Sequence, residues 1–346
     1  MTEPVILFDP YPRSRELIFR EGQWERLQAM GRVVGHEGGR MPGDMVDTYL
    51  PETVAVIGQT DLPAGRLDRA PHLKAILNVE GNFLPTVDYD ICFRRGIHVL
   101  AAAPAFARPV AECALAFALD LARRITFSDR AFRQGREQYG LEGNREGFSL
   151  SGSPVGLIGF GNLARALLPL LAPFRCHIRV FDPWLPDGFI REHHCEPVAL
   201  DDLLRQSRVI FILAAVTAEN EGFIGEREFS LIPKGSAVLL MSRAAVVDFP
   251  VFVRFVREGH FVAATDVFPE EPVPADDPLR DVEGLLLSAH RTAGVRDAFY
   301  RIGDMVIDDL GLILQGLPPL RMQAARRETA ARYKSKPGRS YEKKGR

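Results

Sequence analysis

The sequence has few cysteines and no long hydrophobic run. Its 346 residues include 4 cysteines, and these are scattered without a C-x-x-C pair. This pattern excludes a disulfide-bonded secreted scaffold. No uninterrupted apolar stretch approaches the roughly 18 residues of a membrane span, and the N-terminus lacks the basic and apolar segments of a signal peptide. We therefore expect a cytoplasmic protein with reduced thiols and no membrane partner.

The sequence also lacks an excess of positive charge. Lys+Arg 43 and Asp+Glu 45 give a net charge of -2 at pH 7. Residues 321–346 carry ten Lys/Arg against two Asp/Glu, so residues 1–320 carry 33 against 43. An acidic body of this kind predicts no nucleic-acid partner. Residues 321–346 have no apolar periodicity, and their basic composition predicts a disordered tail.

Short apolar runs alternate with helix-length segments along the chain. Several runs are apolar at every position, which is typical of strands covered on both faces of a parallel sheet. The alternation predicts the α/β class with a doubly wound architecture, and the length suggests about two domains. A long, mostly buried helix is expected over 109–125, opened by Pro109, followed by a polar loop or arm. The expected strands are Val5–Phe8, Val54–Gly58, Leu73–Leu77, Val155–Ile158, Ile178–Phe181, Val209–Leu213, Ala237–Leu240, Ala263–Asp266 and Leu285–Ser288.

A glycine pattern follows one of these strands. Gly159, Gly161 and Ala164 form G-x-G-x-x-A between an apolar strand and a helix. Such a turn lets backbone N–H groups approach a pyrophosphate at the helix N-terminus. Asp182 ends the next strand, where a carboxylate binds the ribose hydroxyls and repels a 2′-phosphate. The pattern predicts a site for NAD rather than NADP.

Three polar residues follow strands in the C-terminal half: Arg243, Glu271 and His290. The carboxyl ends of strands in an open α/β sheet face the ligand crevice, so the three side chains could converge. Arginine can hold a carboxylate in a bidentate fork. Histidine can exchange a proton near neutrality, and a neighbouring glutamate favours its charged form. Taken singly, each residue is also compatible with an ordinary surface or loop position.

In these motifs the chain resembles the D-isomer-specific 2-hydroxyacid dehydrogenase family, which includes phosphoglycerate dehydrogenase and glyoxylate reductase. The motifs occur in the family's order from about Leu73 to Gly294. They are Leu73–Gly81, Arg95–Val99, Val110–Glu112, Gly156–Gly161, Phe181–Pro183, Arg243–Asp248, Asp266–Pro272 and His290-x-x-x-Gly294.

The resemblance implies two Rossmann-like domains, with an NAD-binding domain (104–292) inserted into a flavodoxin-like substrate domain (1–103 and 293–320). A cleft between them would close over cofactor and substrate. It also implies hydride transfer between NAD(H) and a small 2-oxo or 2-hydroxy acid, possibly a phospho or phosphono acid, in a homodimer.

The resemblance further assigns roles to individual residues. Arg243 would bind the substrate carboxylate and carbonyl oxygen, and His290 would be the general acid/base with Glu271 as its partner. Asp266 would face the nicotinamide carboxamide. The full set of implied cofactor contacts is Gly159, Phe160, Gly161, Asn162, Leu163, Asp182, Thr217 and Asp266. The implied substrate contacts are Val79, Glu80, Gly81, Arg243 and His290.

Some positions depart from the family's commonest pattern, and they leave the substrate open. Ala244 replaces the usual glycine after the catalytic arginine, Ala289 replaces the usual proline before the histidine, and Glu80 is unusual beside Gly81. Two alternatives stay open. The chain could be an NAD(H)-sensing corepressor-like protein without significant turnover, or a formate dehydrogenase relative, which Ala289 disfavours.

Overall fold

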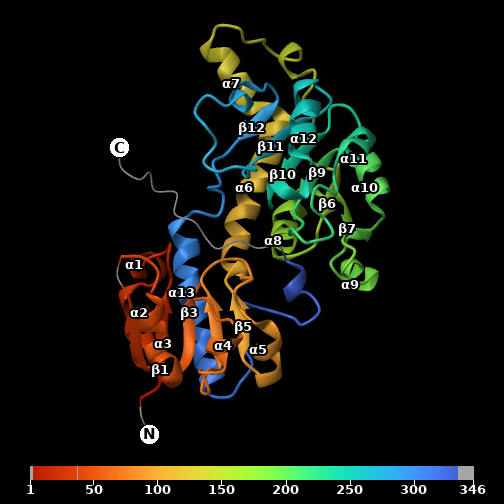
Figure 1. Cartoon of the computed structure of the whole chain (residues 1–346). Coiled ribbons are helices and arrows are strands. Elements are labelled where there is room, and N and C mark those ends of the chain that lie inside the picture. The colour runs from red at the N-terminus through yellow and green to blue at the C-terminus, as the bar shows by residue number, and fades with distance from the viewer. Residues whose placement is uncertain (1–2, 37, 334–346) are drawn as a thin grey trace. The chain divides into compact units, whose positions relative to one another are not determined.

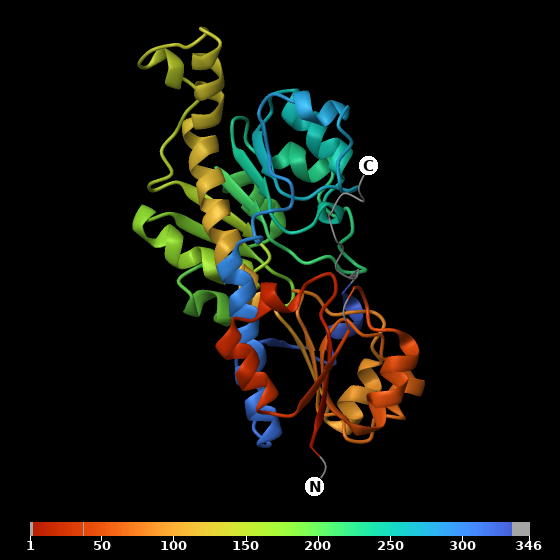
Figure 2. The same ribbon diagram turned by 90° about the vertical axis from the view of Figure 1, so that its left-hand side faces the viewer.

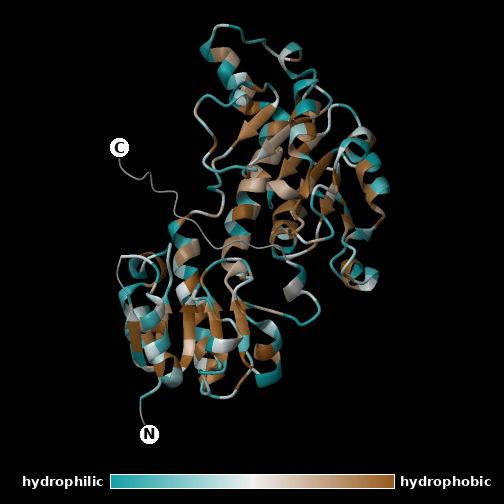
Figure 3. Ribbon diagram, in the orientation of Figure 1, coloured by the Kyte–Doolittle hydropathy of each residue, from teal (hydrophilic) through white to brown (hydrophobic). Residues whose placement is uncertain are grey.

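The computed structural model describes residues 3–36 and 38–333. Their contacts divide the chain into two compact units. The first holds the described residues up to Phe106 and those from Gly294 onward, and the second holds Ala107–Ala293. In each unit the apolar residues of the strands lie beneath helices whose outer faces are polar (Figure 3). The expected α/β class is confirmed.

The first unit is built on a six-stranded sheet in the order β13-β5-β4-β3-β1-β2. Its strands are parallel except β13, which runs antiparallel to β5. The strands are β1 (Val5–Asp9), β2 (Arg32–Gly35), β3 (Thr53–Gly58), β4 (Ala75–Asn78), β5 (His98–Ala101) and β13 (Gln323–Ala324). The helices are α1 (Arg15–Ile18), α2 (Glu21–Gln28), α3 (Gly43–Tyr49), η1 (Leu50–Glu52), α4 (Ala64–Leu67), α5 (Tyr89–Arg95), α13 (Arg296–Leu314) and η6 (Ala330–Arg332).

Alternate residues of β1 show how this sheet is covered on both faces. Ile6 and Phe8 pack in one cluster with the helices α1, α2 and α13. Val5 and Leu7 pack in another cluster with α3, α4 and α5. Both clusters are almost fully buried, which explains why the strand reads as apolar at every position.

The second unit contains a seven-stranded parallel sheet in the order β12-β11-β10-β9-β6-β7-β8 (Figure 1). The strands are β6 (Pro154–Ile158), β7 (His177–Phe181), β8 (Glu196–Pro197), β9 (Val209–Ile212), β10 (Ala237–Leu240), β11 (Val262–Thr265) and β12 (Leu285–Leu287). The helices are α6 (Ala103–Arg123), α7 (Ile125–Arg133), η2 (Glu142–Asn144), α8 (Asn162–Leu171), η3 (Ala172–Phe174), α9 (Asp187–Glu192), α10 (Leu200–Gln206), α11 (Glu226–Leu231), η4 (Ala244–Val246), α12 (Phe249–Arg257) and η5 (Pro278–Asp281). Helices α6 and α8 cover one face, and α10, α11 and α12 cover the other.

The long helix differs from its sequence prediction at its start. Helix α6 begins at Ala103, so Pro109 lies inside the helix rather than opening it. Proline lacks the N–H that would bond to the carbonyl four residues earlier, and this is why sequence reasoning placed the start there. The segment after it is also more helical than expected, because α7 forms over Ile125–Arg133. Figure 2 shows α6 running along its unit to the arm that contains α7.

The prediction of disorder from residue 321 is wrong for residues 321–333. The backbone N–H groups of Arg321 and Met322 donate to the buried carboxylate of Asp309, at 2.9 and 2.7 Å. Strand β13 then pairs with β5. A buried acceptor and a strand edge order this segment, and hydrophobic periodicity reports neither. Residues 334–346 of the expected tail lie outside the described residues.

No helix within residues 3–36 and 38–333 has both the length and the apolar character needed to cross a bilayer.

Candidate active site

The glycine turn after β6 has the conformation that its sequence predicts. Gly159 has a φ of 90°, and a Cβ there would lie 2.7 Å from the backbone N and Cα of Ala214. Gly161 is the N-cap of α8, and a Cβ there would meet nothing within 4 Å. Ala164 is fully buried against the sheet. The turn therefore requires glycine at Gly159 for steric reasons and leaves open space beside Gly161.

Asp182 ties the end of β7 to this turn. Its Oδ2 accepts the backbone N–H of Phe160 at 2.8 Å, and its Oδ1 accepts the N–H of Trp184 at 2.9 Å. The Phe160 side chain is buried and packs edge-on against His193. The sequence pattern pointed to Asp182 and Phe160 but did not reveal that the carboxylate holds this backbone N–H.

The remaining expected cofactor residues of this unit lie near the same sheet edge. Asn162 and Leu163 open α8, where Asn162 Oδ1 accepts from Arg165 at 3.2 Å and Leu163 packs on the core. Thr217 lies beyond the carboxyl end of β9 and is buried. Its N–H donates to Asn220 Oδ1 at 2.7 Å, which fixes the local turn.

His290 and Glu271 form a close pair. The distance from His290 Nδ1 to Glu271 Oε2 is 2.7 Å, and the side chains are 29% and 15% exposed. Glu271 Oε1 accepts the N–H of Phe268 at 2.9 Å, so the carboxylate is itself held in place. His290 adopts a φ of 49°, an unusual conformation for a residue other than glycine. The surroundings hold this imidazole in one orientation, which is typical of a functional histidine.

Asp266 accepts hydrogen bonds from the backbone directly after this histidine. Its carboxylate is 2% exposed and accepts the N–H of Arg291 at 3.0 Å and the N–H of Thr292 at 3.2 Å. It also accepts the hydroxyl of Thr292. Burial raises the pKa of Cys113 on α6, and the charge of the nearby Asp266 carboxylate raises it further. The sequence predicted a contact between Asp266 and the cofactor. It did not reveal the hydrogen bonds between Asp266 and the backbone that follows His290.

Arg243 follows β10 and is the N-cap of η4. Its Nη1 donates to the carbonyl of Ser242 at 2.7 Å, and the residue is exposed. Arg243, Asp266 and His290 all follow parallel strands, so they lie at the edge of the sheet where the glycine turn lies. The second unit thus places the expected acid/base pair, the arginine and the glycine turn at one sheet edge.

The Val79–Gly81 loop belongs to the first unit and follows β4. The N–H of Glu80 donates to Asn78 Oδ1 at 3.0 Å, so it is already engaged within the loop. A Cβ on Gly81 would lie 3.4 Å from the Phe106 ring and 3.5 Å from Ala103 Cα. The loop therefore packs against the first turn of α6, whose residues up to Phe106 belong to the first unit. Arg13 also contacts this loop, and no sequence motif indicated it.

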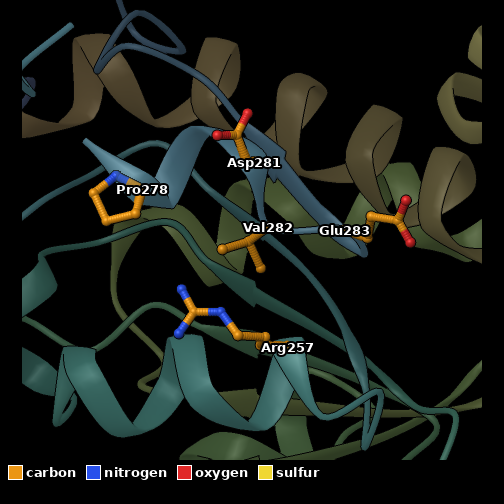
Figure 4. Close-up of a pocket in the computed structure, with 5 residues that line it drawn as sticks. All are labelled: Arg257, Pro278, Asp281, Val282 and Glu283. Atoms are coloured by element: carbon orange, nitrogen blue, oxygen red, sulfur yellow. The ribbon is translucent and has the colours of Figure 1, made fainter. Parts of the chain in front are cut away.

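A surface hollow lies elsewhere in the second unit. It is lined by Arg257, Pro278, Asp281, Val282 and Glu283. Figure 4 shows the Asp281 and Glu283 side chains lying apart from the Arg257 guanidinium. Arg257 ends α12, which precedes β11, and the other four residues precede β12, so the hollow lies at the amino ends of strands. It belongs to the sheet edge opposite the candidate active site.

The comparisons with known proteins agree with this geometry. Residues 115–292, just over half of the chain, match the family model "D-isomer specific 2-hydroxyacid dehydrogenase, NAD binding domain". The chain belongs to the D-isomer-specific 2-hydroxyacid dehydrogenase family, which confirms the resemblance seen in its motifs. The matched model describes an NAD-binding domain, and NAD is the cofactor that the glycine turn and Asp182 predict.

Particular relatives are named as dehydrogenases and reductases. A D-3-phosphoglycerate dehydrogenase of Archaeoglobus fulgidus is 27% identical over 268 residues, which cover 77% of this chain and only 50% of that protein. A glyoxylate reductase of Aeropyrum pernix is 29% identical over 259 residues, covering 73% of this chain and 77% of that protein. The crystal structure of a phosphoglycerate oxidoreductase from Rhizobium etli has 44% identity and a TM-score of 0.85, covering 94% of this chain and 99% of that one.

Proposed function

We propose that this chain is an NAD-dependent D-2-hydroxyacid dehydrogenase that also reduces the corresponding 2-oxo acid. The observation that carries the proposal is the 2.7 Å contact between His290 Nδ1 and Glu271 Oε2. A carboxylate on one ring nitrogen orients the imidazole so that the other nitrogen can exchange a proton with a substrate oxygen. Family membership supplies the reaction class that needs such a proton.

The residues present fit an NAD cofactor. The Gly159–Leu163 turn offers open space at Gly161, and Asp182 supplies an acceptor for ribose hydroxyls at the end of β7. Thr217 and Asp266 complete the proposed cofactor contacts, and Asp266 would do so while anchoring the backbone of Arg291 and Thr292. When bound, NAD(H) supplies or accepts the hydride.

The chain's own residues handle charge and protons. Arg243 can hold the substrate carboxylate and polarise the carbonyl oxygen through its planar fork. His290 donates the proton to that oxygen in the reducing direction and removes it in the oxidising direction. Glu271 stabilises the imidazolium that this cycle requires. Holding the reacting groups in place replaces a random encounter with an oriented one.

We further propose that the first unit binds the substrate. Residues 1–103 and 293–320 would form this domain, and 104–292 the NAD domain. The Val79–Gly81 loop would hold the substrate carboxylate, supported by its place at the carboxyl end of β4 and against the first turn of α6. The Glu80 N–H is already used, so the other two N–H groups of the loop would make the contact. A phospho or phosphono acid is one candidate substrate.

The exposed arm of the second unit supports a homodimer. Ile125, Phe132, Tyr139 and Leu141 are 55–81% exposed, all within α7 and the segment after it. Clustered apolar side chains of this size favour burial against a partner, and we propose a second copy of this chain. The free thiols suit the cytoplasm that the sequence predicts.

A panel of small 2-oxo acids incubated with NADH tests the function. We expect at least one acid, with glyoxylate, pyruvate, hydroxypyruvate and its phosphate among those tried, to be reduced with loss of NADH absorbance. Tight NADH binding without turnover of any acid in either direction would contradict the proposal and favour the corepressor-like alternative.

The cofactor assignment has its own test in Asp182→Ala. We expect weaker NADH binding and a smaller advantage of NADH over NADPH in kcat/KM, because the ribose acceptor and the repulsion of a 2′-phosphate are lost. Asp187→Ala is a matched control, because Asp187 is an exposed residue five positions further along the chain. An unchanged preference in Asp182→Ala would contradict the ribose assignment.

A further inference from the structure

Arg13 forms a bidentate salt bridge with Glu80 in the first unit. Arg13 Nε donates to Glu80 Oε1 at 2.7 Å, and Nη2 donates to Oε2 at 3.3 Å. The side chains are only 25% and 12% exposed. The guanidinium also lies 4.9 Å from the centre of the Phe299 ring. A two-point contact over an aromatic face holds a carboxylate more rigidly than a single exposed ion pair does.

Glu80 lies at the centre of the Val79–Gly81 loop. The Glu80 carbonyl accepts the N–H of Ala102 at 2.8 Å, and its N–H donates to Asn78 Oδ1. Asn78 Nδ2 in turn donates to the carbonyl of Asn82 at 2.7 Å. The backbone of Glu80 and its side chain are thus fixed independently, and among the described residues Arg13 is the only side-chain partner of this carboxylate.

The charge of Glu80 has a direct consequence for an anionic ligand. A carboxylate in the loop would repel a substrate carboxylate bound to the same loop, and at partial burial this repulsion is weakly screened. Arg13 cancels the charge at contact distance. Without Arg13 the loop would carry one uncompensated negative charge where an anion has to bind.

Building on the function proposed above, we propose that Arg13 is the positioning residue of the Val79–Gly81 loop. It holds the Glu80 side chain and neutralises a carboxylate that would otherwise weaken binding of the substrate's own carboxylate. The Arg13–Glu80 pair therefore sets the affinity of the loop for small carboxylic acids and takes no part in proton or hydride transfer.

A set of charge-removing variants tests this inference. The readouts are KM and kcat for glyoxylate at saturating NADH, and the Kd of oxamate for the NADH-loaded chain. Oxamate is a carboxylate that mimics a 2-oxo acid and carries an uncharged amide. In Arg13→Gln we expect KM and the oxamate Kd to rise about tenfold, with kcat little changed. The rise should shrink when ionic strength increases from about 0.02 to 0.5 M, because salt screens the exposed part of the repulsion.

The partner variants separate charge from shape. Glu80→Gln should lower KM below the parental value, since it removes the negative charge from the binding loop and releases Arg13. Arg13→Gln with Glu80→Gln should return KM to within about threefold of the parent, the non-additivity typical of contacting residues. Arg66→Gln is the control, because it breaks the partly buried Arg66–Asp47 pair (2.9 Å) between α4 and α3 and should leave KM unchanged.

Specific results would overturn the inference. An unchanged KM and oxamate Kd in Arg13→Gln would do so, and so would a double variant as weak as Arg13→Gln. If Arg13→Gln does not fold, Arg13→Lys and Glu80→Gln provide the test. Arg13→Lys should raise KM only slightly and independently of salt. An equal rise of KM in Arg13→Lys and Glu80→Gln would show that the pair is purely structural and would overturn the inference. If the parent reduces no acid, the proposed function fails, and the oxamate affinities alone still support or overturn the role of Arg13.

Discussion

The two units each contain a carboxylate in close contact with a basic side chain, and the two pairs are almost matched in distance and burial. His290 Nδ1 lies 2.7 Å from Glu271 Oε2, and Arg13 Nε lies 2.7 Å from Glu80 Oε1. Their exposures are 29% and 15% in the first case and 25% and 12% in the second. The basic side chains differ. Histidine can release a proton near neutrality, whereas arginine remains charged in proteins.

The same distance and burial therefore support different tasks. A histidine beside a fixed carboxylate can pass a proton to a substrate, which is what the function proposed for the second unit requires. A permanent cation beside a carboxylate can only hold it and cancel its charge, which suits a binding loop. Function follows from the chemical nature of the cation and from the neighbouring groups more than from the ion pair itself.

The largest expected effect comes from making the two pairs alike. His290→Arg would place a permanent cation beside Glu271, and His290→Ala would remove the imidazole. Both should lower kcat by about 10²–10⁴-fold, because neither supplies a transferable proton. NADH binding, followed by fluorescence, should change little. His177→Ala, at the amino end of β7, is the control. Near-parental kcat in both His290 variants would contradict the acid/base assignment.

A second prediction concerns the arginine of the second unit. Arg243→Lys keeps the charge but loses the planar fork, so we expect KM for the 2-oxo acid to rise and kcat to fall, with kcat/KM reduced by about 10–100-fold. Steady-state kinetics with the best acid of the panel measures both. Arg257→Lys is the matched control, because Arg257 lies at the opposite edge of the same sheet. Unaltered kinetics in Arg243→Lys would mean that another group holds the carboxylate.

A third prediction tests the support behind the histidine. Asp266→Asn leaves one of the buried donors of Arg291 and Thr292 without an acceptor, at a cost of about 1–3 kcal/mol in unfolding free energy. The denaturation midpoint of the second unit should fall, and kcat should fall with it because the His290 backbone loses its anchor. Full activity with reduced stability would show that the anchor serves folding alone.

The smallest effect concerns the thiols, one deeply buried in each unit. Burial raises the pKa of both Cys92, in the first unit, and Cys195, in the second, to about 11. The reactive thiolate is therefore scarce at pH 8 and becomes common only as the pH approaches that value. We expect alkylation at pH 8 to modify the half-buried Cys113 and Cys176 first, as peptide mapping can show. Rapid native-state labelling of Cys92 or Cys195 would contradict this order.

Much of the second unit could be predicted from the sequence, because its determinants are local. The glycine turn, Asp182 and the strand-end residues follow apolar runs at recognisable spacing. The first unit was harder to predict. Arg13 and Glu80 are separated by 67 positions, so no local pattern links them. The order of residues 321–333 depends on Asp309 and on the edge of β5, which lie far away along the chain.

Some features of the second unit were hidden for the same reason. Asp266 was recognisable as a strand-end carboxylate, but its bonds to Arg291 and Thr292 cross 25 and 26 positions. The start of α6 at Ala103 was missed because Pro109 is a strong helix-start signal in sequence, whereas packing tolerates it inside this helix. Tertiary contacts decided each of these points.

The most direct test of the central claim follows the transferred hydrogen. The parental chain is incubated with NADH deuterated at the transferable position and with a 2-oxo acid, and the product is analysed for isotope and configuration at C2. The account predicts deuterium at C2 of a D-2-hydroxy acid in the parent and a rate at least about 100-fold lower in His290→Ala. Deuterium in no acid of the panel, or undiminished transfer in His290→Ala, would contradict it.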